Sequence, residues 1–298
     1  MTRQLAVLVV VLGAMFLSTG ALFMRLIESA GGFQILFYRS ITLCATILAF
    51  VCIRRRHTPL QVIRSLDRID LGIGLLISLS FTGYVFAVLN TTVPSALFIL
   101  TASPLVAATV GWLWIGEKPH PVTWLSMAVA CGGVMFMLGD GLAAGRTFGN
   151  FCALVAASSF AVMLVFARRS RKTDILGGSF LAGLLSGLYG FVVVVTVGSG
   201  LEVATRDLLL ILTTGVVSIG IGLACITWGT PYMPAAEVGV IVLVESVLGP
   251  FWVWLFGFEG ITGAEIVGGA AVLASVVLLS VFSGRSIPLP GDRKAGIG

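Results

Sequence analysis

Long runs of apolar residues, separated by short polar segments, follow one another along the whole chain. Each run has about 18–22 residues, and a helix of that length, rising 1.5 Å per residue, crosses roughly 30 Å of hydrocarbon. The pattern therefore predicts an all-α polytopic membrane protein with ten transmembrane helices. We expect these helices near residues 4–24, 32–53, 71–90, 94–115, 121–139, 148–167, 175–198, 207–229, 233–257 and 262–282.

The composition agrees with lipid as the natural solvent. Of the 298 residues, 58% are hydrophobic and 10% are charged, and the mean hydropathy is +1.08. A soluble domain has roughly 45–50% apolar and about 25% charged residues. Five cysteines lie inside apolar runs without paired spacing, which favours small buried hydrophobes over a disulfide or metal framework. They are Cys44, Cys52, Cys131, Cys152 and Cys225.

Basic residues are distributed unevenly over the connections between the runs. If the N-terminus is cytoplasmic, most of the 18 basic residues fall on the cytoplasmic side, whereas Arg25, Arg146 and Arg206 fall outside. This asymmetry predicts cytoplasmic N- and C-termini. The net charge of +5 therefore reflects the charges of the loops. The sequence has no basic patch interleaved with aromatic residues, so nothing in it indicates nucleic-acid binding.

Serine and proline positions recur at a constant offset and indicate an internal duplication. Ser18–Thr19 matches Ser158–Ser159 and Ser78 matches Ser218, in each case 140 residues later. We therefore expect a first five-helix repeat over 1–140 and a second over 148–283, followed by a basic cytoplasmic tail over 284–298. Because five is odd, the second repeat would be inverted, as in secondary transporters with a binding site near the midplane.

Several motifs give the chain a resemblance to the EamA family of the drug/metabolite transporter superfamily. They are Phe37-Tyr-Arg39, Pro104 ahead of Gly116-Glu117, and Glu245 followed by Gly257-Phe-Glu259. The resemblance covers nearly the whole chain and implies two five-helix halves around a central cavity. Ser246 follows Glu245 where the family often has proline, which puts the position of a kink in question.

Within this family the chain is most similar to bacterial amino-acid exporters. That resemblance implies export of aromatic and neutral amino acids and related metabolites by alternating access, in the bacterial inner membrane, by a monomer. Two alternatives remain open. One is a multidrug or other small-metabolite carrier of the same fold, with or without proton coupling, and the other is a membrane channel or receptor.

Two charged residues stand out because they lie within apolar runs. A carboxylate at the centre of a membrane helix costs about 2.5–3.5 kcal/mol, so Glu245 must face protein or a wet cavity. In one interpretation Glu245 borders the transport path and either accepts a proton or pairs with the amino group of a substrate. In the other it stays neutral and accepts hydrogen bonds from neighbouring helices. Arg39 either holds a substrate carboxylate, or it extends outward to the interface or bonds carbonyl groups at a helix end.

Uncharged polar and aromatic groups at membrane depth complete the candidate substrate-binding set. Hydroxyls with aromatic faces suit a zwitterionic or uncharged amphiphilic solute. The alternatives are that each hydroxyl bonds a carbonyl of its own helix and that each tryptophan marks an interface. The resemblance places their helices around the cavity. The candidates are Tyr38, Tyr84, Thr101, Ser103, Ser158, Thr227, Trp228 and Ser246.

Two further motifs have structural interpretations. The pairs Trp112/Trp114 and Trp252/Trp254 lie near helix ends, which favours interfacial anchors. Gly183-x-x-x-Gly187 favours close helix packing within the monomer.

Motifs of other protein classes are missing from the sequence. It has no phosphate-binding loop of the G-x-x-x-x-G-K-[ST] type. The two histidines, His57 and His120, fall in loops, so neither a metal site nor a Ser–His–Asp arrangement can be assembled at membrane depth. We expect no enzymatic activity, cofactor or metal, and only a small-molecule substrate and the lipid bilayer as partners.

Overall fold

The computed structural model describes residues 3–55, 58–116, 121–143, 145–170, 175–197, 200–232 and 235–283, and these residues form helices and connections with no strand among them. His57, Glu117, His120 and the tail over 284–298 lie outside the described residues. The helices are α1 Arg3–Arg25, α2 Gly32–Arg55, α3 Pro59–Arg64, α4 Arg68–Asn90, α5 Val93–Thr101, α6 Ser103–Ile115, α7 Pro121–Ala143, α8 Thr147–Arg169, α9 Leu176–Val197, α10 Thr205–Thr213, the π-helix η1 Thr214–Ile221, α11 Gly222–Gly229, the short 3-10 helix η2 Thr230–Tyr232, α12 Ala235–Leu255 and α13 Gly263–Ser283.

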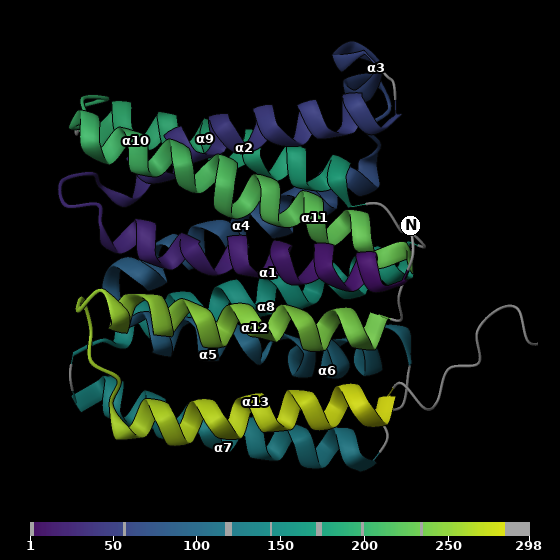
Figure 1. Ribbon diagram of the computed structural model, residues 1–298, viewed down its shortest axis with the longest axis vertical. Helices are drawn as coiled ribbons and strands as arrows, with labels where there is room; N and C mark the ends of the chain where they lie inside the picture. The colour runs from purple at the N-terminus through teal and green to yellow at the C-terminus, as the bar shows by residue number, and fades with distance from the viewer. Residues whose placement is uncertain are drawn as a thin grey trace, which may run out of the picture.

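The long helices lie side by side across the molecule (Figure 1), and they begin and end close to the predicted apolar runs. Seven segments are long and apolar enough to cross a membrane, and three further apolar helices are shorter within the described residues. The chain is thus a multi-pass membrane protein. The exact number of ten spans remains a prediction.

Local structure departs from the predicted uninterrupted helices in two places. The helix expected at 94–115 is broken at Ala102, directly before α6 and its proline at the second position. Proline has no N–H to donate to the preceding turn, which explains the break. The helix expected at 207–229 contains the π-helical segment η1, and such segments are often found at functional sites.

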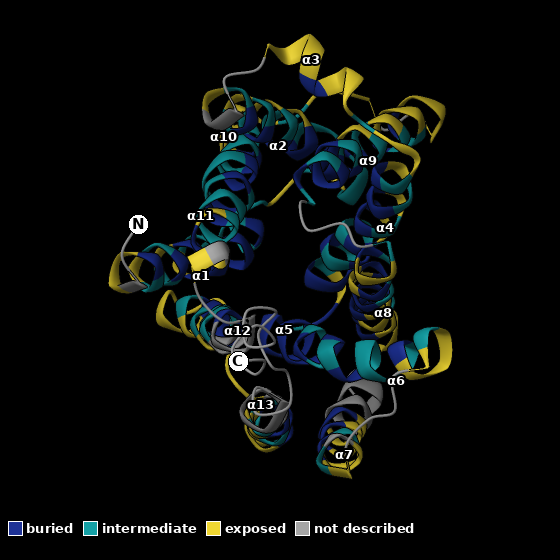
Figure 2. Cartoon of the chain, turned by 90° about the vertical axis from the view of Figure 1, so that its right-hand side faces the viewer, coloured by how far each residue is buried: buried dark blue, intermediate teal, exposed yellow. Residues whose placement is uncertain are grey.

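The helices form a ring, visible end-on in Figure 2. Neighbouring elements contact one another in the order α1, α11 with η1, α2, α9, α4, α8, α5 with α6, and α12, which returns to α1. Helices from before residue 144 alternate around this ring with helices from after residue 146. The α7 and α13 helices pack against each other beside α5.

Glycines allow the closest helix pairs to approach, as expected for packing in lipid. A Cβ atom on Gly183 would lie 2.7 Å from Cys44 Sγ, and one on Gly187 would lie 3.2 Å from the Cβ of Ser40. Ser40 and Ser186 share a 2.8 Å hydrogen bond at the same interface. The predicted role of Gly183-x-x-x-Gly187 in packing within the monomer, here of α9 on α2, is confirmed.

Candidate functional site

Arg39 extends from α2 into the ring and is fully enclosed by protein. Its side chain is 0% exposed, and its Nε, Nη1 and Nη2 atoms have no hydrogen-bond partner among the described residues. The guanidinium lies over the Phe81 ring of α4, 5.2 Å from the ring centroid. This separation permits a cation–π interaction, but it provides no neutralising charge.

Two tyrosines share the electrostatic environment of Arg39. Tyr84 of α4 and Tyr189 of α9 both interact with its charge. The Tyr189 hydroxyl is held by α4, because it donates to the Ser78 carbonyl at 2.9 Å and also bonds Thr82. Tyr84 has no such hydrogen bond with the described residues, and its hydroxyl lies 3.9 Å from the point where a Cβ atom on Gly20 would stand.

Glu245 is a second charged group that acts on Tyr84. Its side chain is half-buried on α12, and it interacts electrostatically with Tyr84, as do Arg39 and Arg25. Tyr84 is therefore within electrostatic reach of a buried cation from the first part of the chain and of a carboxylate from the second.

The neighbour of Glu245 joins α12 to the helix break. Ser246 and Thr101 are buried and share a short hydrogen bond, and Thr101 also donates to the Leu97 carbonyl at 2.8 Å. Ser103 begins α6 directly after the break and is also buried. These three hydroxyls therefore gather where the α5–α6 interruption meets α12.

The remaining predicted residues lie apart from this cluster. The Tyr38 hydroxyl donates to the Leu201 carbonyl at 2.7 Å, which ties α2 to a connection. Thr227 donates to the Leu223 carbonyl of its own helix at 2.7 Å. Ser158 and Trp228 are exposed. The structure thus connects Arg39 and Glu245 only through their common electrostatic partner Tyr84. Thr101 and Ser246 bond each other next to Glu245, and Ser103 lies just after the same helix break.

Three aromatic residues near these groups were not predicted as site residues. Phe81 and Tyr189 contribute to the surroundings of Arg39, but nothing in the sequence distinguishes them from other aromatic residues in apolar runs. Trp252 differs from the predicted interfacial anchor, because it is half-buried and its Nε1 donates to Ser18 Oγ at 3.0 Å. The serine landmark at Ser18 was the available signal for that contact.

The ends of the helices near Arg25, which we call the Arg25 end, are held together by charged groups. Arg25 of α1 pairs with Glu259, which follows α12, and also donates to the Thr91 carbonyl. Glu259 accepts from the Val93 N–H at 2.8 Å. Burial raises the pKa of Glu259, and the nearby positive charge of Arg25 opposes that rise.

A second carboxylate extends the contacts at the Arg25 end. Glu265 of α13 is 1% exposed and accepts from Ser95 at 3.0 Å and from Arg146 at 3.4 Å. It also bonds Thr92. The connections before α5, before α8 and before α13 are therefore drawn together at this end.

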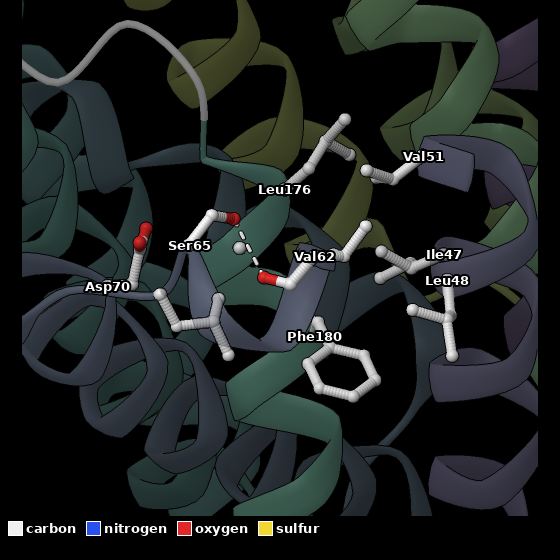
Figure 3. Close-up of a pocket in the computed structure, with 10 residues that line it drawn as sticks. Ile47, Leu48, Val51, Val62, Ser65, Asp70, Leu176 and Phe180 are labelled. Carbon is white, nitrogen blue, oxygen red and sulfur yellow. Dashed lines mark hydrogen bonds between the residues drawn. The ribbon is translucent and has the colours of Figure 1, made fainter. Parts of the chain in front are cut away.

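A pocket near the opposite ends of α2, α3, α4 and α9 is separate from the Arg39 cluster. Figure 3 shows its mostly apolar lining, which includes Ile47, Val51, Leu176 and Phe180. The Ser65 hydroxyl beside it donates to the Val62 carbonyl at 2.7 Å. No group of three metal-ligating side chains occurs among the described residues.

Spanning helices arranged around buried charged groups define a multi-pass membrane protein of the transporter class. The sequence matches the EamA-like transporter family over residues 4–139 and 147–281, so the chain belongs to that family. It is also 25% identical over 275 residues to an "uncharacterized transporter" of Archaeoglobus fulgidus, which covers 90% of this chain and 94% of that protein. A solved crystal structure matches 96% of this chain and 100% of its own with a TM-score of 0.67 at 17% identity, which shows a shared fold.

Proposed function

We propose that this transporter is a secondary carrier that exports amino acids, including aromatic and neutral ones, and related metabolites. The observation that supports the proposal is that one buried phenol, Tyr84, interacts electrostatically with both the positive charge of Arg39 and the negative charge of Glu245. A free amino acid carries one charge of each sign at neutral pH. The hydroxyls of Thr101, Ser103 and Ser246 offer further polar contacts beside Glu245.

The proposed membrane arrangement has ten spans in two inverted repeats, over 1–140 and 148–283. The family matches the chain in two successive segments, and helices from the two segments alternate around the ring. Since every neighbouring pair in the ring is completed within one chain, a monomer suffices for function. The basic loops favour a bacterial inner membrane with both termini, including the tail over 284–298, in the cytoplasm.

In this orientation the Arg25 end faces outside. The ion pair of Arg25 with Glu259 and the bonds to Glu265 join the two segments there. The described arrangement is therefore proposed as the outward-closed state of an alternating-access cycle. Opening toward the outside requires these bonds to separate.

Purified protein in liposomes tests the proposed function. A panel of labelled amino acids is measured for counterflow, with and without an imposed pH gradient. We expect saturable, stereoselective exchange of neutral and aromatic amino acids. Flux that does not saturate would indicate a channel, and transport of cationic drugs without any amino-acid transport would indicate a multidrug carrier.

A further inference from the structure

Arg39 is a fully buried charge for which the described part of the chain provides no ion-pair partner. Transfer of a guanidinium from water into protein costs several kcal/mol unless a partner of opposite charge compensates it. Its side chain is 0% exposed, and the three guanidinium nitrogens have no hydrogen-bond acceptor among the described residues. The charge is thus placed where an anion would be bound most strongly.

The groups around Arg39 are aromatic rather than acidic. Phe81 presents its ring to the guanidinium, and the titratable groups that act on it are Tyr84 and Tyr189. Glu245 acts on Tyr84 but is not among the groups that act on Arg39. The protein groups facing Arg39 therefore leave its positive charge available to a ligand.

The two tyrosine hydroxyls differ in what they can offer to a ligand. Tyr189 is engaged, because it donates to the Ser78 carbonyl and bonds Thr82. Tyr84 has no hydrogen bond with the described residues, and it interacts electrostatically with both Arg39 and Glu245. Its hydroxyl is therefore free to donate to a molecule bound at Arg39.

We propose that Arg39 and Tyr84 form the subsite for the carboxylate of the transported molecule. The planar guanidinium offers paired N–H donors that match the two oxygens of a carboxylate, and the phenol supplies a further donor. The proposal rests on the proposed transport function and narrows its substrate class to carboxylates. A molecule without a carboxylate leaves the cation uncompensated and binds weakly.

The enclosure of Arg39 links this subsite to the transport cycle. Because the guanidinium is inaccessible in the described arrangement, α2 and α4 must separate before a carboxylate can reach it. Access to the subsite therefore requires a change in helix packing.

A matched ligand series tests the subsite on the unmodified protein. Phenylalanine, phenylalaninamide, phenethylamine and phenylpropionate share one aromatic group but differ in the carboxylate and the amino group. Competition for labelled substrate is measured with purified protein in liposomes. We expect the two carboxylates to compete roughly 10- to 100-fold more strongly than the amide and the amine, the range typical of hydrogen bonds to charged groups.

Variants assign the effect to the two residues. Tyr84→Phe and Arg39→Lys should each weaken carboxylate binding by about tenfold or more and reduce the preference for acid over amide. Tyr232→Phe is the matched control, because Tyr232 is 45% exposed and should leave that preference unchanged. If Arg39→Lys does not fold, Tyr84→Phe and the ligand series still decide the question.

The possible outcomes separate this inference from the proposed function. Equal competition by phenylalanine and its amide would overturn the carboxylate subsite even if amino acids are transported. Binding of phenylpropionate without any amino-acid transport would support the subsite and refute amino-acid export. An unchanged acid preference in Tyr84→Phe would remove Tyr84 from the subsite and overturn the proposal in its present form.

Discussion

The ion pair between Arg25 and Glu259 should contribute measurably to stability because both groups are largely withdrawn from water. Their side chains are 23% and 14% exposed, and Glu259 also accepts from the Val93 N–H. Removal of one partner of a buried pair costs about 3–5 kcal/mol. Partial exposure and the retained Val93 bond reduce the expected cost of Glu259→Gln to about 2 kcal/mol, or roughly 30-fold in the unfolding equilibrium.

Reversible unfolding by SDS in mixed micelles measures this cost, and a double-mutant cycle with Arg25→Gln isolates the coupling between the two charges. The matched control is Glu28→Gln, since Glu28 pairs with Arg206 while both side chains are mostly exposed, at 72% and 59%. Exposed pairs contribute about 0–1 kcal/mol. If Glu259→Gln proves as mild as Glu28→Gln, our view of the Arg25 end as a buried electrostatic contact is wrong.

Two further predictions concern packing and coupling. Gly149→Ala should destabilise the protein by about 1–3 kcal/mol, because the added Cβ would lie 2.5 Å from the backbone carbon of Asn90. Gly132→Ala is the matched control, since the added Cβ would have nothing within 4 Å. It should stabilise the protein by roughly 0.5–1 kcal/mol in the same SDS unfolding experiment. If Glu245 carries a coupled proton, Glu245→Gln should abolish the pH dependence of transport in liposomes, and a retained dependence would exclude it from the proton path.

The positions of the helices follow from local sequence. In lipid every backbone polar group needs an internal partner, so a long apolar run has the helix as its stable form. For the same reason Arg39 and Glu245 stood out as candidates, since a charge in an apolar run needs a special environment. The break at Ala102 was not predicted, although Pro104 just after it was noted.

The alternating ring and the grouping of side chains inside it depend on contacts between distant segments. Tyr189 lies 150 residues after Arg39 in the chain, and an aromatic residue in an apolar helix looks the same whether it faces lipid or a buried cation. The pairing of Arg25 with Glu259 likewise joins two helix ends far apart in sequence. Apolar periodicity records where each helix runs but not which helix lies beside it, because lipid and protein interior are both apolar surroundings. Packing therefore determined which polar groups meet, whereas hydropathy alone had already specified a helical membrane protein.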